Sequence, residues 1–288
     1  MNWLLLTILA ITSRAVFGVA VKVLSNHARV SAATQAILLT TGAGLLALLI
    51  SPLIGGLTTT GLAAMWDIAL IMVVSQAFGN MLFFKGLEKL DASTAQIAFA
   101  SILVWSTLLA IIFLHSSFTL KQFVGIAILM LAILIVQYSK NGARKLNEGV
   151  VYIFMSTFLF AVFQTSSAEL AKTVSAGTYT VLAFLGSTLI ISAVYSGRLK
   201  KDMPFLKTNA KKLIPFILFA CGTSLMYFVF SYFAYKHAPD RGVVVVLLTS
   251  QVILSVILAI IFLKERSQVG RKLVGGALAV VAGVLIKS

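Results

Sequence analysis

The sequence predicts an all-α integral membrane protein whose ten transmembrane helices form two inverted five-helix repeats. Three observations lead to this prediction: an apolar composition, the spacing of the apolar segments, and an internal repeat. Of the 288 residues, 60% are hydrophobic and only 11% are charged. Soluble domains are about half apolar and about a quarter charged. Most of this chain therefore needs lipid rather than water around it.

The apolar segments have the length of membrane-spanning helices, since about 20 apolar residues cross the hydrocarbon core. We expect spans at residues 3–24, 32–50, 67–84, 94–114, 121–138, 150–171, 178–196, 213–235, 242–263 and 268–286, joined mostly by short polar loops. No Lys or Arg precedes the first apolar run, so we interpret it as a spanning helix rather than a signal peptide.

The internal repeat divides the chain into two halves. Residues 108–114 read LLAIIFL and residues 257–263 read ILAIIFL, and the same alignment pairs Ser101 with Ser250. We therefore expect a first five-helix repeat at residues 1–143 and a second at residues 144–288. A repeat with an odd number of spans inserts its second copy in the opposite direction.

The formal net charge of +15 would suggest a nucleic-acid partner in a soluble protein. Here the basic residues lie between apolar segments, so the expected partners are the lipid bilayer and a small solute, not nucleic acid. The connection after the seventh span is basic at Arg198, Lys200, Lys201, Lys207, Lys211 and Lys212, whereas the one after the second span has no basic residue. The positive-inside rule then places both termini outside the cell inner membrane.

Arg14 lies near the middle of the first predicted span, where a charge costs about 2.5–3.5 kcal/mol on insertion scales. We predict that it binds a carboxylate or another anion of the substrate. Two alternatives remain: an ion pair with Glu169, or a shifted helix that lets Arg14 reach the interface. Glu169 itself precedes Lys172 by one helical turn, which favours an interfacial salt bridge over a proton-coupling role.

Uncharged polar residues also lie at membrane depth. Helical spacing places Gln76 on one face with Asn80, and Ser101 on one face with Trp105. Such residues either line a wet cavity or hydrogen-bond between helices, and their number favours a cavity. The predicted substrate-binding set is Arg14, Gln76, Asn80, Gln96, Ser101, Trp105, Gln164, Tyr227 and Gln251.

The sequence lacks the motifs that are typical of catalysis and of cofactor binding. The three histidines fall in separate loop regions, so we expect no metal site. The chain has no Gly-rich loop followed by Lys-Ser/Thr, so we expect neither ATP nor another cofactor, and no enzymatic activity. The single cysteine, Cys221, is interpreted as a packed residue.

Residues 232–286 contain AYK at 234–236, KER at 264–266 and GGA at 275–277. This layout resembles the closing segment of EamA-type members of the drug/metabolite transporter superfamily, and residues 83–138 are a second copy with HSS at 115–117. The chain departs from the pattern of that family in two places. The proline often found midway along the fourth and ninth spans is missing, and Arg14 lies near the position where the first span commonly has Trp-Gly. The resemblance implies a secondary transporter, often an exporter of amino acids or other metabolites, with a cavity between the halves.

Together these features predict a transporter that works by alternating access around a midplane site. We expect export of a small amphipathic metabolite, such as an amino acid or a relative of one, by a monomer or a homodimer. The alternative is a non-transporting membrane module, such as a lipid-handling protein or a sensor.

Overall fold

The computed structural model describes residues 2–28, 30–90, 98–99, 101–137, 148–263 and 269–287, and all regular elements in these ranges are helices. The elements are α1 (Trp3–His27), α2 (Ala32–Ile50), η1 (Ser51–Ile54), α3 (Trp66–Lys89), α5 (Ile102–Phe113), α6 (Leu120–Gln137), α7 (Glu148–Leu170), α8 (Ala176–Val181), η2 (Leu182–Gly186), α9 (Ser187–His237), α10 (Arg241–Leu248), α11 (Gln251–Leu263) and α12 (Val269–Lys287). The all-α prediction is confirmed for the described part of the chain.

Five helical segments within the described ranges are long and apolar enough to cross a membrane: Trp3–Ser25, Ala32–Ile54, Trp66–Lys89, Glu148–Leu170 and Ala176–His237. Shorter apolar helices cover Ile102–Phe113, Leu120–Ala132 and Arg241–Ser255. Large apolar side chains such as Leu49 and Leu53 are exposed on the outer surface, where lipid can cover them. The chain is therefore a multi-pass membrane protein.

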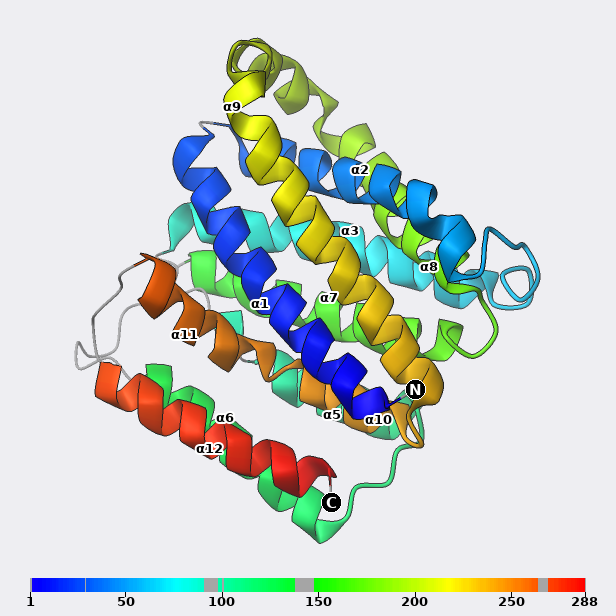
Figure 1. Ribbon diagram of the computed structural model, residues 1–288, viewed down its shortest axis with the longest axis vertical. Helices are drawn as coiled ribbons and strands as arrows, with labels where there is room; N and C mark the ends of the chain where they lie inside the picture. Colours follow the sequence, from blue (N-terminus) through cyan, green and yellow to red (C-terminus); the bar gives the residue numbers. More distant parts are fainter. Residues whose placement is uncertain are drawn as a thin grey trace.

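The helices pack mainly in antiparallel pairs. The most extensive contacts join α3 to α7, α1 to α9, and α6 to α12, and Figure 1 shows α1 beside the later part of α9 and α6 beside α12. His27 stacks on Phe216 with ring centroids 5.1 Å apart, while Arg14 faces Tyr227, so α1 runs opposite to the end of α9. The carbonyl of Gly79 in α3 accepts a 2.8 Å hydrogen bond from Ser156 in α7.

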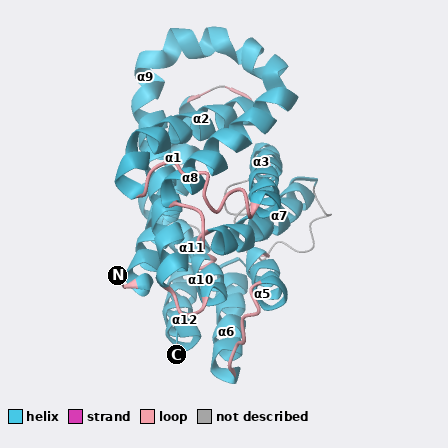
Figure 2. Ribbon diagram, turned by 90° about the vertical axis from the view of Figure 1, so that its right-hand side faces the viewer, coloured by secondary structure: helices cyan, strands magenta, loops and turns pink. Residues whose placement is uncertain are grey.

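The seventh and eighth predicted spans are not separated by a loop. Residues 197–212, which we expected to be a polar connection, are helical, and α9 runs for 51 residues with non-helical backbone angles only at Tyr195. Figure 2 shows the helix arching over one end of the molecule. Lys, Leu and Arg make up half of residues 197–212, and because they are good helix formers the stretch is helical even though Pro204 lies within it.

The ninth predicted span is broken rather than continuous. α10 ends at Leu248 and α11 begins at Gln251. Between them the amides of Thr249, Val252 and Ile253 bond carbonyls three residues back, which is a tight turn instead of an α-helix. The break places Gln251 at the start of a helix in the interior of the protein, where it is only 3% exposed.

The contact between α8 and the segment after η1 depends on a glycine. A Cβ at Gly177 would lie 2.4 Å from the backbone oxygen of Gly56, whereas one at Gly222 would meet nothing within 4 Å. We expect Gly177→Ala to destabilise the protein by about 1–3 kcal/mol, as overpacking does, and to lower its thermal midpoint in detergent. Gly222→Ala is the matched control and should leave the midpoint unchanged or raise it; equal midpoints for the two variants would contradict the packing described.

Candidate functional site

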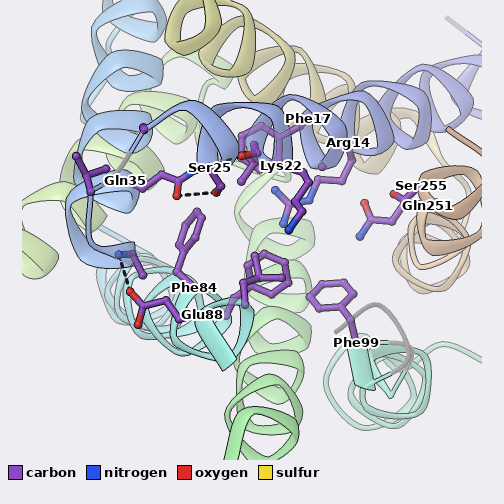
Figure 3. A pocket seen from close by; sticks show the side chains of 17 residues that line it. Arg14, Phe17, Lys22, Ser25, Gln35, Phe84, Glu88, Phe99, Gln251 and Ser255 are labelled. Atoms are coloured by element: carbon purple, nitrogen blue, oxygen red, sulfur yellow. Dashed lines mark hydrogen bonds between the residues drawn. The ribbon is translucent and has the colours of Figure 1, made fainter. Parts of the chain in front are cut away.

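A cavity of about 250 Å³ lies between α1, the start of α2, the end of α3 and α11 (Figure 3). Its inner wall includes Arg14 and the buried Gln251, and its outer rim includes Ser25 and Glu88, both of which are exposed. The cavity therefore reaches the surface at the end of the molecule where α1 stops. We call this end the mouth.

A second, narrower space of about 30 Å³ continues the cavity inward. The two spaces share Arg14, Phe17, Phe84, Phe99 and Gln251, so we treat them as one chamber. The inner part adds polar side chains from four helices: Thr40, Gln76, Asn80, Gln164, Ser224 and Tyr227. The chamber thus leads from the mouth to a polar interior surrounded by aromatic rings.

Arg14 is the charged group at the centre of this chamber. Its guanidinium carbon lies 4.9 Å from the ring centroid of Phe17, 5.7 Å from that of Phe160 and 5.4 Å from that of Tyr227. Rings at these distances attract a cation through their quadrupoles. The salt bridges among the described residues do not include Arg14. Glu169 pairs instead with Lys172 at 2.5 Å and approaches Arg241 at 3.9 Å. Glu169 is therefore not the partner of Arg14 in this structure.

The amides of the chamber fall into two groups. The side-chain oxygen of Gln164 accepts a hydrogen bond from Ser106, and its nitrogen donates one to the Tyr227 hydroxyl, both at 3.3 Å. The side-chain oxygens of Gln76 and Gln251 are buried and have no hydrogen-bond partner within the described part of the chain. Buried amide oxygens are nearly always paired, so these two acceptors mark places where a ligand or water is expected to bind.

The end of the chamber opposite the mouth is closed by aromatic side chains. The ring of Phe228 lies 4.2 Å from that of Phe184 and 5.4 Å from that of Phe163, and all three line the inner chamber. Tyr179 packs behind them, 6.1 Å from Phe228 and 5.4 Å from Tyr232. We call these five residues, Phe163, Tyr179, Phe184, Phe228 and Tyr232, the ring layer.

On its far side the ring layer meets the surface of the opposite end of the molecule. The Tyr232 hydroxyl donates a 2.5 Å hydrogen bond to the carbonyl of Val174. Tyr232 and Val174 also line a depression of about 480 Å³, together with Lys172 and Lys236. One layer of buried rings thus separates the chamber from the opposite surface.

The mouth, by contrast, is held by carboxylates at the first turn of α2. The Ser31 amide and hydroxyl donate hydrogen bonds of 2.9 and 2.8 Å to one oxygen of Asp202, and the Ala32 amide donates one of 2.9 Å to Glu88. Negative charge at a helix N-terminus is favourable because the amides there have no partner within the helix. The contacts tie α2 to the ends of α3 and of the α9 arch.

Of the predicted site residues, Arg14, Gln76, Asn80, Gln164, Tyr227 and Gln251 line the chamber. Ser101 and Trp105 lie apart from it: Ser101 hydrogen-bonds Thr157 at 2.8 Å, and Trp105 packs on Phe154 and Phe158. Gln96 falls outside the described residues. Glu88, Lys22 and Gln35 also line the chamber and were not predicted, since polar side chains near helix ends indicate positions close to a loop rather than a cavity.

Comparison with known proteins gives a family match and a fold match. Residues 1–138 match the EamA-like transporter family. A solved structure titled "Crystal structure of protein" is similar over 98% of this chain and 98% of its own, with a TM-score of 0.75 and 12% sequence identity, which shows the fold alone. No curated protein matches the chain.

The opening of the chamber at the mouth can be tested by thiol labelling. Cys221 is the single cysteine of the chain and is buried, so Cys221→Ala gives a background without reactive thiols. In that background we expect Ser255→Cys, in the chamber wall, to react with a membrane-impermeant thiol reagent added on the mouth side only. Ser231→Cys, at a position 2% exposed, is the control and should stay unmodified. Labelling of Ser255→Cys from the opposite side alone would show that the chamber opens there instead.

Proposed function

We propose, from the premise that residues 1–138 are an EamA-like transporter domain, that the whole chain is a secondary transporter that moves a small metabolite by alternating access. The observation that carries this proposal is the chamber around Arg14, open at the mouth and closed at the opposite end by the ring layer. A solute bound there has access to one side of the membrane only, which is one of the two states that alternating access requires. The substrate class that we favour is an amino acid or a related amphipathic solute.

We propose that the chain crosses the membrane ten times, although only five helical segments within the described residues are long and apolar enough to cross it on their own. A helix of 62 residues would extend about 93 Å at 1.5 Å per residue, about three times the hydrocarbon thickness. We therefore assign the segment from Ala176 to Tyr195 to one span and the end of α9 to the next. The discontinuous α10 and α11 together make the ninth span, and α5 belongs to the fourth.

Helix pairing supports two inverted halves, residues 1–143 and 144–288. The first and eighth spans pack as α1 and the end of α9, and the sixth and third spans pack as α7 and α3. An inverted repeat converts each of these pairs into the other, since it exchanges the first span with the sixth and the third with the eighth. The pair formed by α6 and α12 is converted into itself.

Two helix starts support the same relation. α2 begins at the sequence VSAAT and α8 at VSAGT. In each case the serine caps the helix: Ser31 accepts from the Thr34 amide at 3.3 Å and Ser175 from the Thr178 amide at 3.2 Å. In both caps the serine and threonine hydroxyl oxygens also lie 3.0 Å apart. The Ser31 cap lies at the mouth and the Ser175 cap at the opposite end, as inverted halves require.

The broken helices support it as well. The turn before α11 is built on Ser250, whose amide bonds the carbonyl of Leu247. The turn before α5 is built on Ser101, whose amide bonds the carbonyl of Ala98. Ser101 and Ser250 are the pair that the internal sequence repeat aligns. Broken helices at matching positions are typical of the midplane sites of secondary transporters.

Charge supports an orientation in which the mouth faces the cytoplasm. The basic arch of α9 lies at the mouth, since Asp202 within it bonds Ser31. Basic connections are retained on the cytoplasmic side. In this orientation both termini lie outside the inner membrane, and the chamber takes up its solute from the cytoplasm, which favours export. A non-transporting lipid-handling protein or a sensor is the alternative function.

Flux through proteoliposomes tests the proposal. Vesicles containing the purified chain, loaded with a mixture of labelled amino acids and labelled aromatic carboxylates, should release label faster than protein-free vesicles. Release should saturate with internal concentration, because a site that must change its access is limited in rate. A lipid-handling protein would move fluorescent phospholipid between leaflets and release none of these solutes, and that result would overturn the proposed function.

The ring layer gives a sharper test of alternating access. Tyr232→Phe keeps the ring but loses the hydrogen bond to Val174, worth about 0.5–1.5 kcal/mol. We expect this change to favour the state open at the opposite end by about 2- to 12-fold. Labelling of Ser231→Cys from that side, in the Cys221→Ala background, should then rise in proportion. Tyr235→Phe is the control, because no hydrogen bond of its hydroxyl is described; equal labelling in both variants would exclude Tyr232 as a gate.

A further inference from the structure

The guanidinium of Arg14 is only partly stabilised by its surroundings. Three rings face it at 4.9 to 5.7 Å, and such contacts contribute about 0.5–2 kcal/mol each. Rings attract the charge but do not accept the five N–H donors in the way that an oxygen does. Within the described ranges, neither a hydrogen bond nor a salt bridge to the Arg14 side chain is present. The site therefore lacks the planar, anionic acceptor that a guanidinium binds best.

Two further groups in the same chamber lack partners. The amide oxygens of Gln76 and Gln251 are both buried, each residue being 3% exposed, and both line the inner chamber. Figure 3 places Gln251 and Arg14 on the same cavity, Gln251 from α11 and Arg14 from α1. An unpaired buried acceptor costs about 1–3 kcal/mol. A neutral hydroxyl or N–H on the ligand would remove that cost.

The walls between these polar groups are aromatic and apolar. Phe99 lies 5.4 Å from Phe83 and 5.8 Å from Phe160, in edge-to-face geometry. Phe17 and Phe84 complete the aromatic lining shared by both parts of the chamber. The volume of about 250 Å³ is just below the common range of small-molecule pockets, about 300–1,000 Å³. The space suits a single planar ring with a short side chain.

The distribution of negative charge separates two classes of carboxylate ligand. Among the described residues that line the chamber, the acidic one is Glu88, at the rim, where it binds the Ala32 amide. The ammonium group of an amino acid held at Arg14 would lie near the guanidinium and would have no described carboxylate beside it. Burying an ammonium group without a counter-charge is costly. A ligand that carries only the carboxylate avoids this cost.

We propose that the chamber binds a planar aromatic monoanion, with its carboxylate on Arg14, its ring among the phenylalanines, and a neutral donor toward Gln76 or Gln251. The preference is for the anion over the zwitterionic amino acid that has the same ring. This assignment rests on the proposed function, since it names the substrate class for the same chamber. It narrows the amphipathic solute proposed above to relatives of amino acids that lack the ammonium group.

Four ligands that share a phenyl ring test the assignment: phenylacetate, phenylacetamide, phenylalanine and phenethylamine. Their binding to the purified full-length protein is measured by calorimetric titration and by thermal shift. We expect phenylacetate to bind at least tenfold more tightly than each of the other three, a difference of about 1.4 kcal/mol. Binding of phenylalanine as tight as that of phenylacetate would overturn the preference for an anion.

Variants locate the interaction. We expect Arg14→Gln to weaken phenylacetate binding at least tenfold and to change phenylacetamide binding less than twofold. Arg14→Lys keeps the charge but loses the planar guanidinium, so its affinity for phenylacetate should lie between that of the wild type and that of Arg14→Gln. Gln251→Glu adds a carboxylate to the chamber wall and leaves Arg14 in place; it should abolish phenylacetate binding without lowering the thermal midpoint. Unchanged phenylacetate affinity in Arg14→Gln and Gln251→Glu would overturn the assignment.

The assignment and the transport function fail in different ways. If phenylacetate binds through Arg14 but no labelled solute crosses proteoliposomes, the proposed transport is wrong and the ligand class stands. If labelled amino acids are released equally well by wild type and by Arg14→Gln, the protein transports and the anion assignment is wrong.

Discussion

A guanidinium charge within an apolar helix bundle is the constraint on which the rest of the site depends. Arg14 cannot face lipid at its depth in α1 without a large cost, so the bundle must surround it with groups that tolerate a cation. Phe17, Phe160 and Tyr227 do so from three different helices. Water that enters at the mouth can supply the remaining hydrogen bonds. A chamber open to one side is therefore what the position of Arg14 requires as well as what a transporter needs.

The two ends of the chamber are held by different kinds of interaction, although related helix starts lie at both. Ser31 at the mouth bonds the charged Asp202, whereas Ser175 at the opposite end donates to the neutral carbonyl of Gly56 at 2.8 Å. Carboxylates can exchange protein partners for water at modest cost when they are near the surface. Buried rings can separate only if apolar surface becomes exposed to water, which costs about 25 cal/mol for each Å². The mouth is thus the end that is easier to rearrange.

Most of the helices and much of the candidate site could be predicted from the sequence. The helices and the site residues were predicted for different physical reasons. Apolar length locates a span, so α2 was predicted at its observed bounds. Polarity at membrane depth identified Arg14, Gln76 and Gln251, because such groups are expensive in lipid wherever they lie. Ser101 and Trp105 show where this reasoning stops: helical spacing places them on a common face but does not reveal whether that face meets the chamber or a neighbouring helix.

Other features depend on contacts that a one-dimensional pattern does not contain. Glu88 lies in a charged helix end and becomes part of the mouth because the Ala32 amide of α2 binds it. The arch of α9 is helical although Pro204 lies within it, and its charge predicts exposure rather than a loop. The break before Gln251 is likewise not predicted by the sequence, because no glycine or proline lies at it. It nevertheless brings an unpaired amide into the interior. A continuous helix is what the apolar pattern of this span predicts, so the pattern gives no sign that the Gln251 oxygen lies unpaired in the chamber wall.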